Sequence, residues 1–286
     1  DASEGDIILL KLDSNGNLLQ EKIYGNSSTE IGGTILVEED KGAIIGACRT
    51  NRNQVSKNFF SKTYIFKTDS LGNVEWEFLS PPNKIQNIAK GLVKSKDDGL
   101  VVATSRGYEH PINSTVGQIW WESAYFFKLD ENQQMDWEIE VKDSINPGPA
   151  LGIERLISVD GGNAYVAAGQ YNIIRSLDPL IGGTFGWTFK FSDAGELIWI
   201  RKHQIVETLG HRHEVFDLKQ TSDGGFIIVG KAQGSINGIE PTSQAWLLKL
   251  DSFGCLIPGC QWLDTISTTT AQPENARVEL AIYPNP

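Results

Sequence analysis

Residues 221–254 read TSDGGFIIVGKAQGSINGIEPTSQAWLLKLDSFG and contain two short apolar runs. The first run, Phe226–Gly230, follows an Asp-Gly-Gly turn, and the second, Ala245–Leu250, leads into the Asp-Ser-Phe-Gly turn that ends at Gly254. Both runs are too short to be buried helices, and both are bounded by residues typical of tight turns. The stretch therefore predicts antiparallel β-strands joined in hairpins.

The same pattern recurs along the chain with a period of about 60 residues. A lysine ends the second run of every copy, and in most copies an aspartate follows two residues later: Lys11, Lys67, Lys128, Lys190 and Lys249. The acidic turn before the first run recurs at 39–42, 97–99, 160–162 and 223–225, and a tryptophan closes three copies at Trp76, Trp137 and Trp199. Two hairpins per period predict a four-stranded antiparallel unit that is repeated.

A four-stranded unit of this kind has two apolar faces that it cannot bury alone. Radial packing of the units buries both faces and leaves only short sheet edges, which is the β-propeller arrangement. An open β-solenoid is the alternative, although solenoid coils are usually shorter than this period. We therefore predict an all-β chain that forms a β-propeller-like array of about four complete four-stranded blades plus a half.

The repeat predicts one propeller-like domain over residues 1–263. Its units are expected at 6–24 (a half unit), 31–80, 87–141, 150–202 and 214–262. Because the half unit lacks its two inner strands, we expect either further blades upstream, so that the array is a fragment of a larger ring, or a strained and incomplete ring. Residues 264–277 are rich in Thr, Ser and Pro and predict a linker.

The chain is acidic, with a formal net charge of −11 over 286 residues and an isoelectric point near 4.9. This balance argues against nucleic acid or an anionic membrane as a partner, and it suits the surface of a soluble secreted protein. No apolar run approaches the roughly 20 residues that a membrane helix needs, so we predict no transmembrane segment. The sequence has no phosphate-binding glycine loop, and we predict no cofactor.

The chain has three cysteines. Cys255 and Cys260 bracket a Leu-Ile-Pro-Gly turn, and this spacing suits a small disulfide loop in an exported protein. A metal-binding pair is the alternative, but no histidine or further cysteine lies nearby in the sequence. Cys48 lies in an apolar run and is expected to be a small buried hydrophobic residue.

The units differ most in the insertions between their two hairpins, and binding residues are most often found on such variable loops. In a propeller these insertions would all lie on one face. The second unit places Tyr108, His110, Trp120 and Trp121 there. These side chains predict an aromatic platform for a sugar ring or a peptide. Alternatively, one of the two tryptophans packs into the sheet, because adjacent strand residues point to opposite faces.

No other motif assigns a catalytic or metal site. His211 and His213 would share a face of a strand and could bind zinc, but no third ligand can be placed, so we predict no metal. The turns that begin at Asp13 and Asp69 resemble the start of calcium loops, although hairpin-turn chemistry is a sufficient reason for their aspartates. The Gly-x-Ser-x-Gly and His-Glu-x-x-His motifs are absent, and catalytic residues remain unknown.

The chain ends in Val278–Pro286, which reads VELAIYPNP. Tyr283, Pro284, Asn285 and Pro286 resemble, one by one, the motif at the start of the C-terminal sorting domain of proteins that Bacteroidota export by the type IX secretion system. The Asp-Gly-Gly and Lys-Leu-Asp repeats also resemble the propeller-like repeats common in these secreted proteins. Residues 278–286 match only a truncated start of the sorting domain. The resemblance implies the secretion machinery as a partner and an extracellular or outer-membrane surface location.

These observations predict a secreted or cell-surface, non-catalytic propeller that binds a glycan or a peptide through its insertions. One alternative is an extracellular hydrolase or lyase with its site on the central face of the propeller, since propellers carry many chemistries. Another is a structural spacer for an upstream domain. Carboxylates that converge from different blades would favour the enzyme, and a catalytic or adhesive upstream domain would favour the spacer.

Overall fold

The computed structural model describes residues 5–25, 28–50, 61–81, 88–109, 120–141, 150–173, 183–204, 211–236, 239–256 and 260. In these ranges the regular structure is β-strand, with one 3-10 turn, η1 (Asp160–Gly162). The strands are β1 (Ile7–Leu12), β2 (Leu18–Tyr24), β3 (Thr29–Val37), β4 (Ala43–Thr50), β5 (Ser61–Thr68), β6 (Val74–Leu79), β7 (Gly91–Lys94), β8 (Leu100–Glu109), β9 (Trp120–Leu129), β10 (Met135–Val141), β11 (Ala150–Val159), β12 (Ala164–Ile173), β13 (Gly183–Ser192), β14 (Leu197–His203), β15 (Arg212–Gln220), β16 (Phe226–Ile236) and β17 (Ile239–Leu250).

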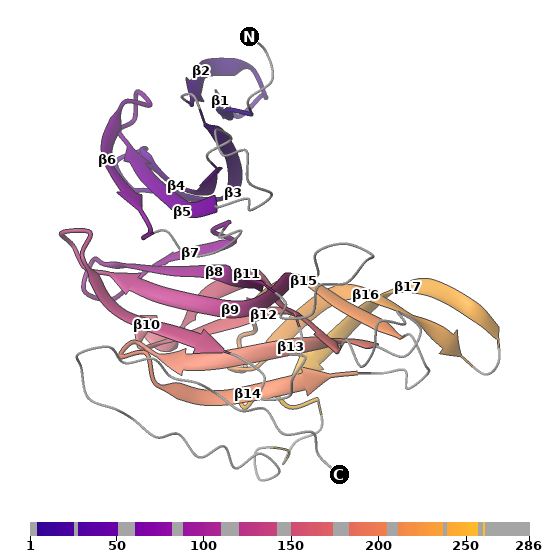
Figure 1. Cartoon of the computed structure of the whole chain (residues 1–286). Helices are drawn as coiled ribbons and strands as arrows, with labels where there is room; N and C mark the ends of the chain where they lie inside the picture. Colours follow the sequence, from indigo (N-terminus) through magenta and orange to yellow (C-terminus); the bar gives the residue numbers. More distant parts are fainter. Residues whose placement is uncertain are drawn as a thin grey trace.

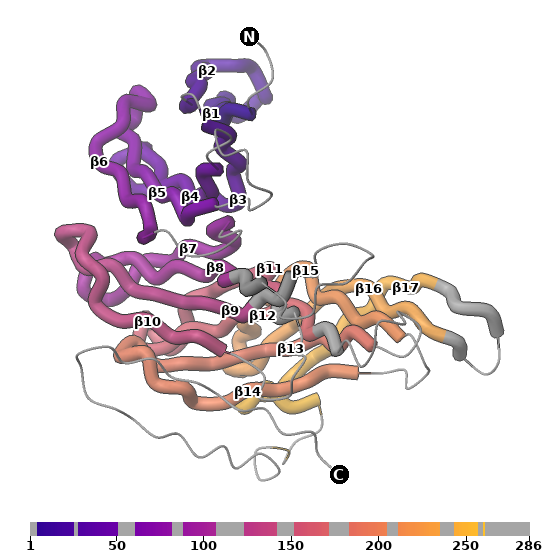
Figure 2. The backbone as a smooth tube through the Cα atoms, in the orientation of Figure 1, coloured from indigo at the N-terminus to yellow at the C-terminus, as the bar shows by residue number. Residues whose placement is uncertain are grey.

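The strands pair with their neighbours in chain order to form successive antiparallel sheets. We refer to β1–β2 as the N-terminal hairpin, and to β3–β6, β7–β10, β11–β14 and β15–β17 as the first, second, third and fourth sheets. The third and fourth sheets are joined by a single parallel residue pair, Thr184 and Arg212. The sheets follow an open arc, with the hairpin at one end and the fourth sheet at the other (Figures 1 and 2). The predicted all-β, propeller-like array is confirmed.

The hydrophobic core lies between successive sheets. Phe126 of the second sheet stacks on Phe189 of the third, with ring centroids 5.2 Å apart. Comparable clusters join the first sheet to the second, the third to the fourth, and the hairpin to the first. Because strand side chains alternate between faces, each sheet contributes to the cluster on either side of it. Each sheet is therefore stabilised mainly by its neighbours.

The position of a residue relative to the recurring lysine decides which neighbouring sheet it contacts. Phe127 and Phe189 come one residue before Lys128 and Lys190, and both pack against the preceding sheet. Ile65 and Phe126 come two residues before their lysines, and both pack against the following sheet. The repeat therefore specifies two different apolar faces for every sheet.

The turn that follows each recurring lysine is closed by its own first side chain. Asp13 Oδ1 accepts the backbone N–H groups of Asn15 and Asn17, both at 2.8 Å, and Asn17 Nδ2 donates to Oδ2 at 2.8 Å. These bonds to Asn17 also lower the pKa of Asp13. Asp69, Asp130 and Asp251 close their turns in the same way. Hairpin closure thus explains the recurring aspartates.

The recurring lysine ties the third strand of each sheet to the turn between its first two strands. Its Nζ lies 2.6–3.1 Å from an aspartate of that turn in all four sheets: Lys67–Asp40, Lys128–Asp97, Lys190–Asp160 and Lys249–Asp223. Lys128 is the most buried of these lysines, and it also reaches Asp193 of the third sheet at 3.1 Å. The repeat pattern therefore marks a structural ion pair.

We expect the contribution of this ion pair to the free energy of unfolding to depend on how deeply the lysine is buried. The Lys128 side chain is 3% exposed, so Lys128→Met should lower the free energy of unfolding by about 2 kcal/mol through loss of charged hydrogen bonds. Lys249 is 47% exposed, and Lys249→Met should cost less than about 1 kcal/mol. Urea unfolding of both variants tests the difference. Equal losses would contradict the role assigned to burial.

Candidate functional site

The strand order sends the connections to two opposite ends of the sheets. Because consecutive strands are antiparallel, the turns after the first and third strands lie at one end, which we call the turn end. The insertions 51–60, 110–119 and 174–182, and the connections between sheets, leave from the other end, which we call the insertion end. The turn end repeats the same lysine–aspartate pairs and closed turns. The insertion end differs between sheets, so it is the candidate functional site.

Three of the four residues predicted to bind a ligand lie at the insertion end of the second sheet. In the β8–β9 ladder Tyr108 is opposite Trp121, and Trp120 is opposite Glu109. Hairpin pairing therefore brings the backbones of Tyr108, Trp120 and Trp121 together, and we call these three residues the aromatic ladder. His110 lies outside the described residues. Ligand binding by these residues remains a prediction.

A buried charged cluster that sequence reasoning missed lies two residue pairs along the same ladder. Arg106 Nη1 donates to Glu140 Oε2 at 3.1 Å, and the Ser123 hydroxyl donates to Glu140 Oε1 at 2.7 Å. The Arg106 guanidinium lies 4.0 Å from the Tyr125 ring centroid, a cation–π geometry. The Tyr125 hydroxyl bonds to Glu138, and burial raises the pKa of Tyr125. The cluster fixes the ends of three strands at the site.

The first sheet carries a similar cluster, in which the buried carboxylate comes from the first strand instead of the fourth. Arg49 Nε donates to the buried carboxylate of Glu30 at 2.8 Å, and its guanidinium lies 3.8 Å from the Tyr64 ring centroid. Arg49 also lies 3.9 Å from Glu77. Burial raises the pKa of Tyr64 to about 12, so its hydroxyl stays protonated at neutral pH.

A signal for both clusters is present in the repeat. Tyr64 and Tyr125 come three residues before the recurring lysine, and Glu77 and Glu138 follow the closing tryptophan directly. The third and fourth sheets carry tryptophan at the tyrosine position. Alignment of the units on the lysine would therefore have divided the units into two kinds, those with tyrosine at this position (Tyr64 and Tyr125) and those with tryptophan (Trp187 and Trp246). The indole Nε1 atoms of these two tryptophans donate to backbone carbonyls at 3.1 and 2.9 Å.

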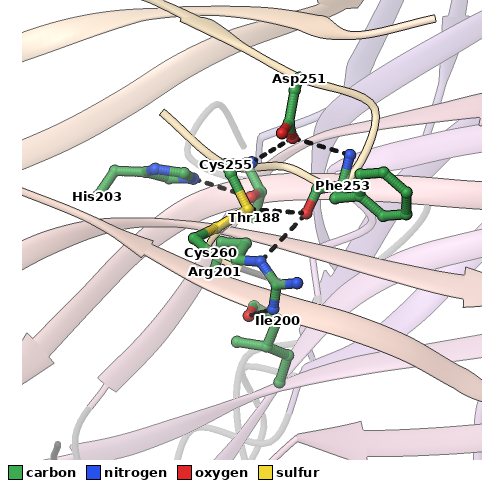
Figure 3. Close-up of a disulfide and its surroundings, with 8 residues drawn as sticks. All are labelled: Thr188, Ile200, Arg201, His203, Asp251, Phe253, Cys255 and Cys260. Atoms are coloured by element: carbon green, nitrogen blue, oxygen red, sulfur yellow. Dashed lines mark hydrogen bonds between the residues drawn. A yellow bond between two sulfur atoms is a disulfide. The ribbon is translucent and has the colours of Figure 1, made fainter. Parts of the chain in front are cut away.

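Histidines occupy the insertion end of the third and fourth sheets. His203 is buried, with Nε2 hydrogen-bonded to the Thr188 hydroxyl at 2.9 Å (Figure 3), and burial lowers its pKa to about 3. His213 is also buried, and its Nδ1 donates to the Thr184 carbonyl at 3.2 Å. The rings of His211, which directly precedes β15, and His213, which lies in it, are 5.3 Å apart. Among the described residues no group of three His, Cys, Asp or Glu side chains is placed to hold a metal.

A disulfide joins Cys255 and Cys260 beside the third sheet, with Cα atoms 5.6 Å apart (Figure 3). Asp251 Oδ1 accepts the backbone N–H groups of Phe253 and Cys255 at 2.9 and 2.8 Å. The Phe253 carbonyl accepts a hydrogen bond from Arg201 Nε of β14 at 3.1 Å. The disulfide loop is thus anchored to the preceding sheet. The predicted linker 264–277 and sorting motif Tyr283–Pro286 lie outside the described residues.

The disulfide predicts a simple thiol count. Cys48 is a buried free cysteine, and burial raises its pKa. We expect a thiol reagent to find no reactive thiol in the native chain and one after denaturation without reductant. All three cysteines should react after denaturation with reductant. Three reactive thiols in the unreduced, denatured chain would show that Cys255 and Cys260 are not bonded.

A cavity of about 330 Å³ lies between the hairpin and the first sheet. Its walls include the apolar side chains of Leu9, Ile35 and Val37, and Lys41 and Asp69 lie among its lining residues at the turn end. None of the residues predicted to bind a ligand lines it. The cavity forms where the two-stranded hairpin packs against a wider, four-stranded sheet.

No protein-family model and no curated protein matches this chain. A solved structure of a protein of unknown function from Dyadobacter fermentans is similar in fold, with a TM-score of 0.52 and 8% identity over 86% of this chain and 68% of that one. The Bombyx mori GH32 β-fructofuranosidase BmSUC1 aligns with a TM-score of 0.43 and 10% identity over 88% of this chain and 56% of its own. The first likeness concerns the fold alone, and the second is too weak to support an argument. Within the described residues, no helix is both long and apolar enough to cross a membrane.

Proposed function

We propose that the protein is a secreted or cell-surface binding module that recognises a glycan or a peptide at its insertion end and catalyses no reaction. The observation that carries this proposal is the contrast between the two ends of the sheets. The turn end repeats the same ion pair in all four sheets, as a structural element would. The insertion end differs between sheets in its aromatic residues and in its buried polar groups, which suits recognition.

The buried cluster of the second sheet supports a binding role for the aromatic ladder. A binding surface needs side chains held by a rigid second layer. Arg106, Glu140 and Ser123 provide such a layer, because they tie β8, β9 and β10 together two residue pairs from Trp121. Aromatic faces are suited to stacking on the apolar faces of sugar rings and on peptide side chains.

The buried and partly buried carboxylates at the insertion end favour binding over hydrolysis. Most glycoside hydrolases use two carboxyl groups that flank the scissile bond. Glu138 and Glu140 lie on one strand, and both contact Arg106, at 4.0 and 3.1 Å. Glu30 is likewise paired with Arg49. These groups are arranged as a structural support.

A ligand screen with matched variants tests the binding role. Wild-type chain should bind a member of a glycan or peptide array, and Trp120→Ala/Trp121→Ala should weaken binding at least about tenfold, or 1.4 kcal/mol. Phe253→Ala removes an exposed aromatic side chain from the turn end and should bind as wild type does. Equal binding by all three proteins would show that the aromatic ladder is not part of the binding site. No binding to any array would favour the spacer function.

Export through the type IX secretion machinery is the second part of the proposal. It is supported by the resemblance of Tyr283, Pro284, Asn285 and Pro286 to the sorting motif, and by a disulfide, which is typical of oxidising compartments. The full protein, expressed in a Bacteroidota strain, should reach the medium or the outer surface. It should remain in the periplasm of a strain that lacks the system. Equal release from both strains would contradict this route.

A further inference from the structure

The third and fourth sheets are joined at the insertion end by a small contact that contains two histidines. The backbone N–H of Thr184 in β13 donates to the His211 carbonyl at 2.9 Å, and His213 Nδ1 of β15 donates to the Thr184 carbonyl at 3.2 Å. The same contact contains the single ladder pair that joins the two sheets within the described residues. We call residues 183–184 and 211–213 the histidine joint.

The rings of the joint lie directly on the backbone of β13. An added Cβ at Gly183 would clash with the His211 ring, and one at Gly186 would clash with the Trp246 ring of β17. His213 is fully buried, and its ring lies 5.2 Å from the Trp246 ring and 5.3 Å from the His211 ring. Because the sequence places glycine at both contact points, the joint closes tightly around His213.

The closed joint disfavours a proton on His213. Burial lowers the pKa of His213 more than its hydrogen bond to Thr184 raises it, and His211 lowers it further. Arg212 and Glu214 flank His213 on β15 and point to the opposite face of the strand. The strands around the joint carry further titratable or charged groups towards the insertion end: Glu154 and Arg155 of β11, Tyr171 of β12, Lys202 and His203 of β14, Lys231 of β16 and Glu240 of β17.

From this geometry we infer that the histidine joint is a pH-sensitive latch: in mild acid the start of β15 separates from β13, while the two sheets stay packed at their core. An opened joint exposes His213 to water, where its ring binds a proton at its ordinary pKa of 6.5. Each pH unit below 6.5 then favours the open joint by about tenfold, until the lowered pKa of the closed joint is reached. The apolar cluster around Leu218 and Phe226 holds the two sheets together away from the joint.

Amide hydrogen exchange followed by NMR tests this inference, because the Thr184 N–H makes one of the bonds of the joint. After correction for the intrinsic exchange rate, the protection factor of Thr184 should fall by about tenfold per pH unit between about pH 6.5 and 5. Val166, buried at the centre of β12, should be more strongly protected at every pH. His213→Gln keeps a donor for the Thr184 carbonyl but cannot bind a proton, so it should remove the fall. His203→Gln, at a buried histidine bonded to Thr188 and not to the joint, should leave the fall unchanged.

A second variant should open the joint without acid. Gly183→Ala places a methyl group against the His211 ring and should lower the protection factor of Thr184 by about tenfold at neutral pH. A wild-type protection factor that stays constant between pH 6.5 and 5 would overturn the inference, and so would an equal fall in His213→Gln. Equal protection of Thr184 and Val166 would show that the sheets unfold together, which would also overturn it. Matching far-ultraviolet circular dichroism spectra at neutral pH show that each variant is folded.

Discussion

Arg106→Met should lower the free energy of unfolding by about 3–5 kcal/mol, the largest loss expected from a single substitution in this chain. The substitution leaves the Glu140 carboxylate, which is 1% exposed, without its charged partner. It also removes the cation that lies over the Tyr125 ring. Denaturant unfolding followed by tryptophan fluorescence measures the loss.

Two controls separate burial from charge in this experiment. Arg106→Met/Glu140→Leu should recover most of the stability, because an apolar pair often replaces a buried ion pair at little cost. Arg155→Met breaks the exposed pair of Arg155 and Asp217, whose atoms lie 3.1 Å apart, and should cost no more than about 1 kcal/mol. Similar small losses for Arg106→Met and Arg155→Met would show that Glu140 is solvated in the folded chain.

The second large effect is a loss of stability in mild acid, caused by buried histidines. His203 has a folded-state pKa of about 3, well below its ordinary value of 6.5, because burial disfavours the charged ring. Below pH 6.5 the unfolded chain binds a proton at this site that the folded chain does not. The free energy of unfolding should therefore fall by about 1.4 kcal/mol per pH unit, and His213, with its pKa also lowered, should add to this slope. Well above pH 6.5 both histidines are neutral in the folded and in the unfolded chain, so neither makes the free energy of unfolding depend on pH.

Urea unfolding between about pH 6.5 and 5 isolates the histidines, because carboxyl groups titrate mostly below this window. His203→Gln keeps a polar partner for Thr188 but cannot bind a proton, so its stability should depend less on pH, by about one proton. Lys249→Met, which touches neither histidine, should keep the wild-type slope. A wild-type chain whose stability is constant across the window would show that His203 is exposed or already charged.

Features that depend on local chemistry were predictable from the sequence. Asp13 and Asn17 close a turn within five consecutive residues, and the recurring lysine shows the same hairpin at every unit. Tyr108 and Trp121 lie in two strands of one hairpin, so the prediction that they gather at one end needed no knowledge of distant contacts. The composition and the period of the repeat were sufficient to predict the all-β, repeated architecture.

Features that depend on register between strands were not predictable in this way. Arg106 and Glu140 are 34 residues apart and lie on β8 and β10, with β9 between them. A shift of one residue in either ladder would turn one of the two side chains to the opposite face. His203 and Thr188 depend in the same way on the register of β13 and β14. Sequence reasoning therefore missed the polar support behind the aromatic ladder.

The placement of the core between sheets has an evolutionary consequence. Each sheet presents one kind of face to its predecessor and another to its successor, and these faces are set by positions next to the recurring lysine. Duplication or deletion of one whole unit therefore creates a junction of a kind that already exists, since stability in such arrays is close to a sum over neighbours. Recombination within the gene can change the length of the array while every remaining junction keeps its packing. Insertions at the other end of each unit are then free to diverge without disturbing these junctions.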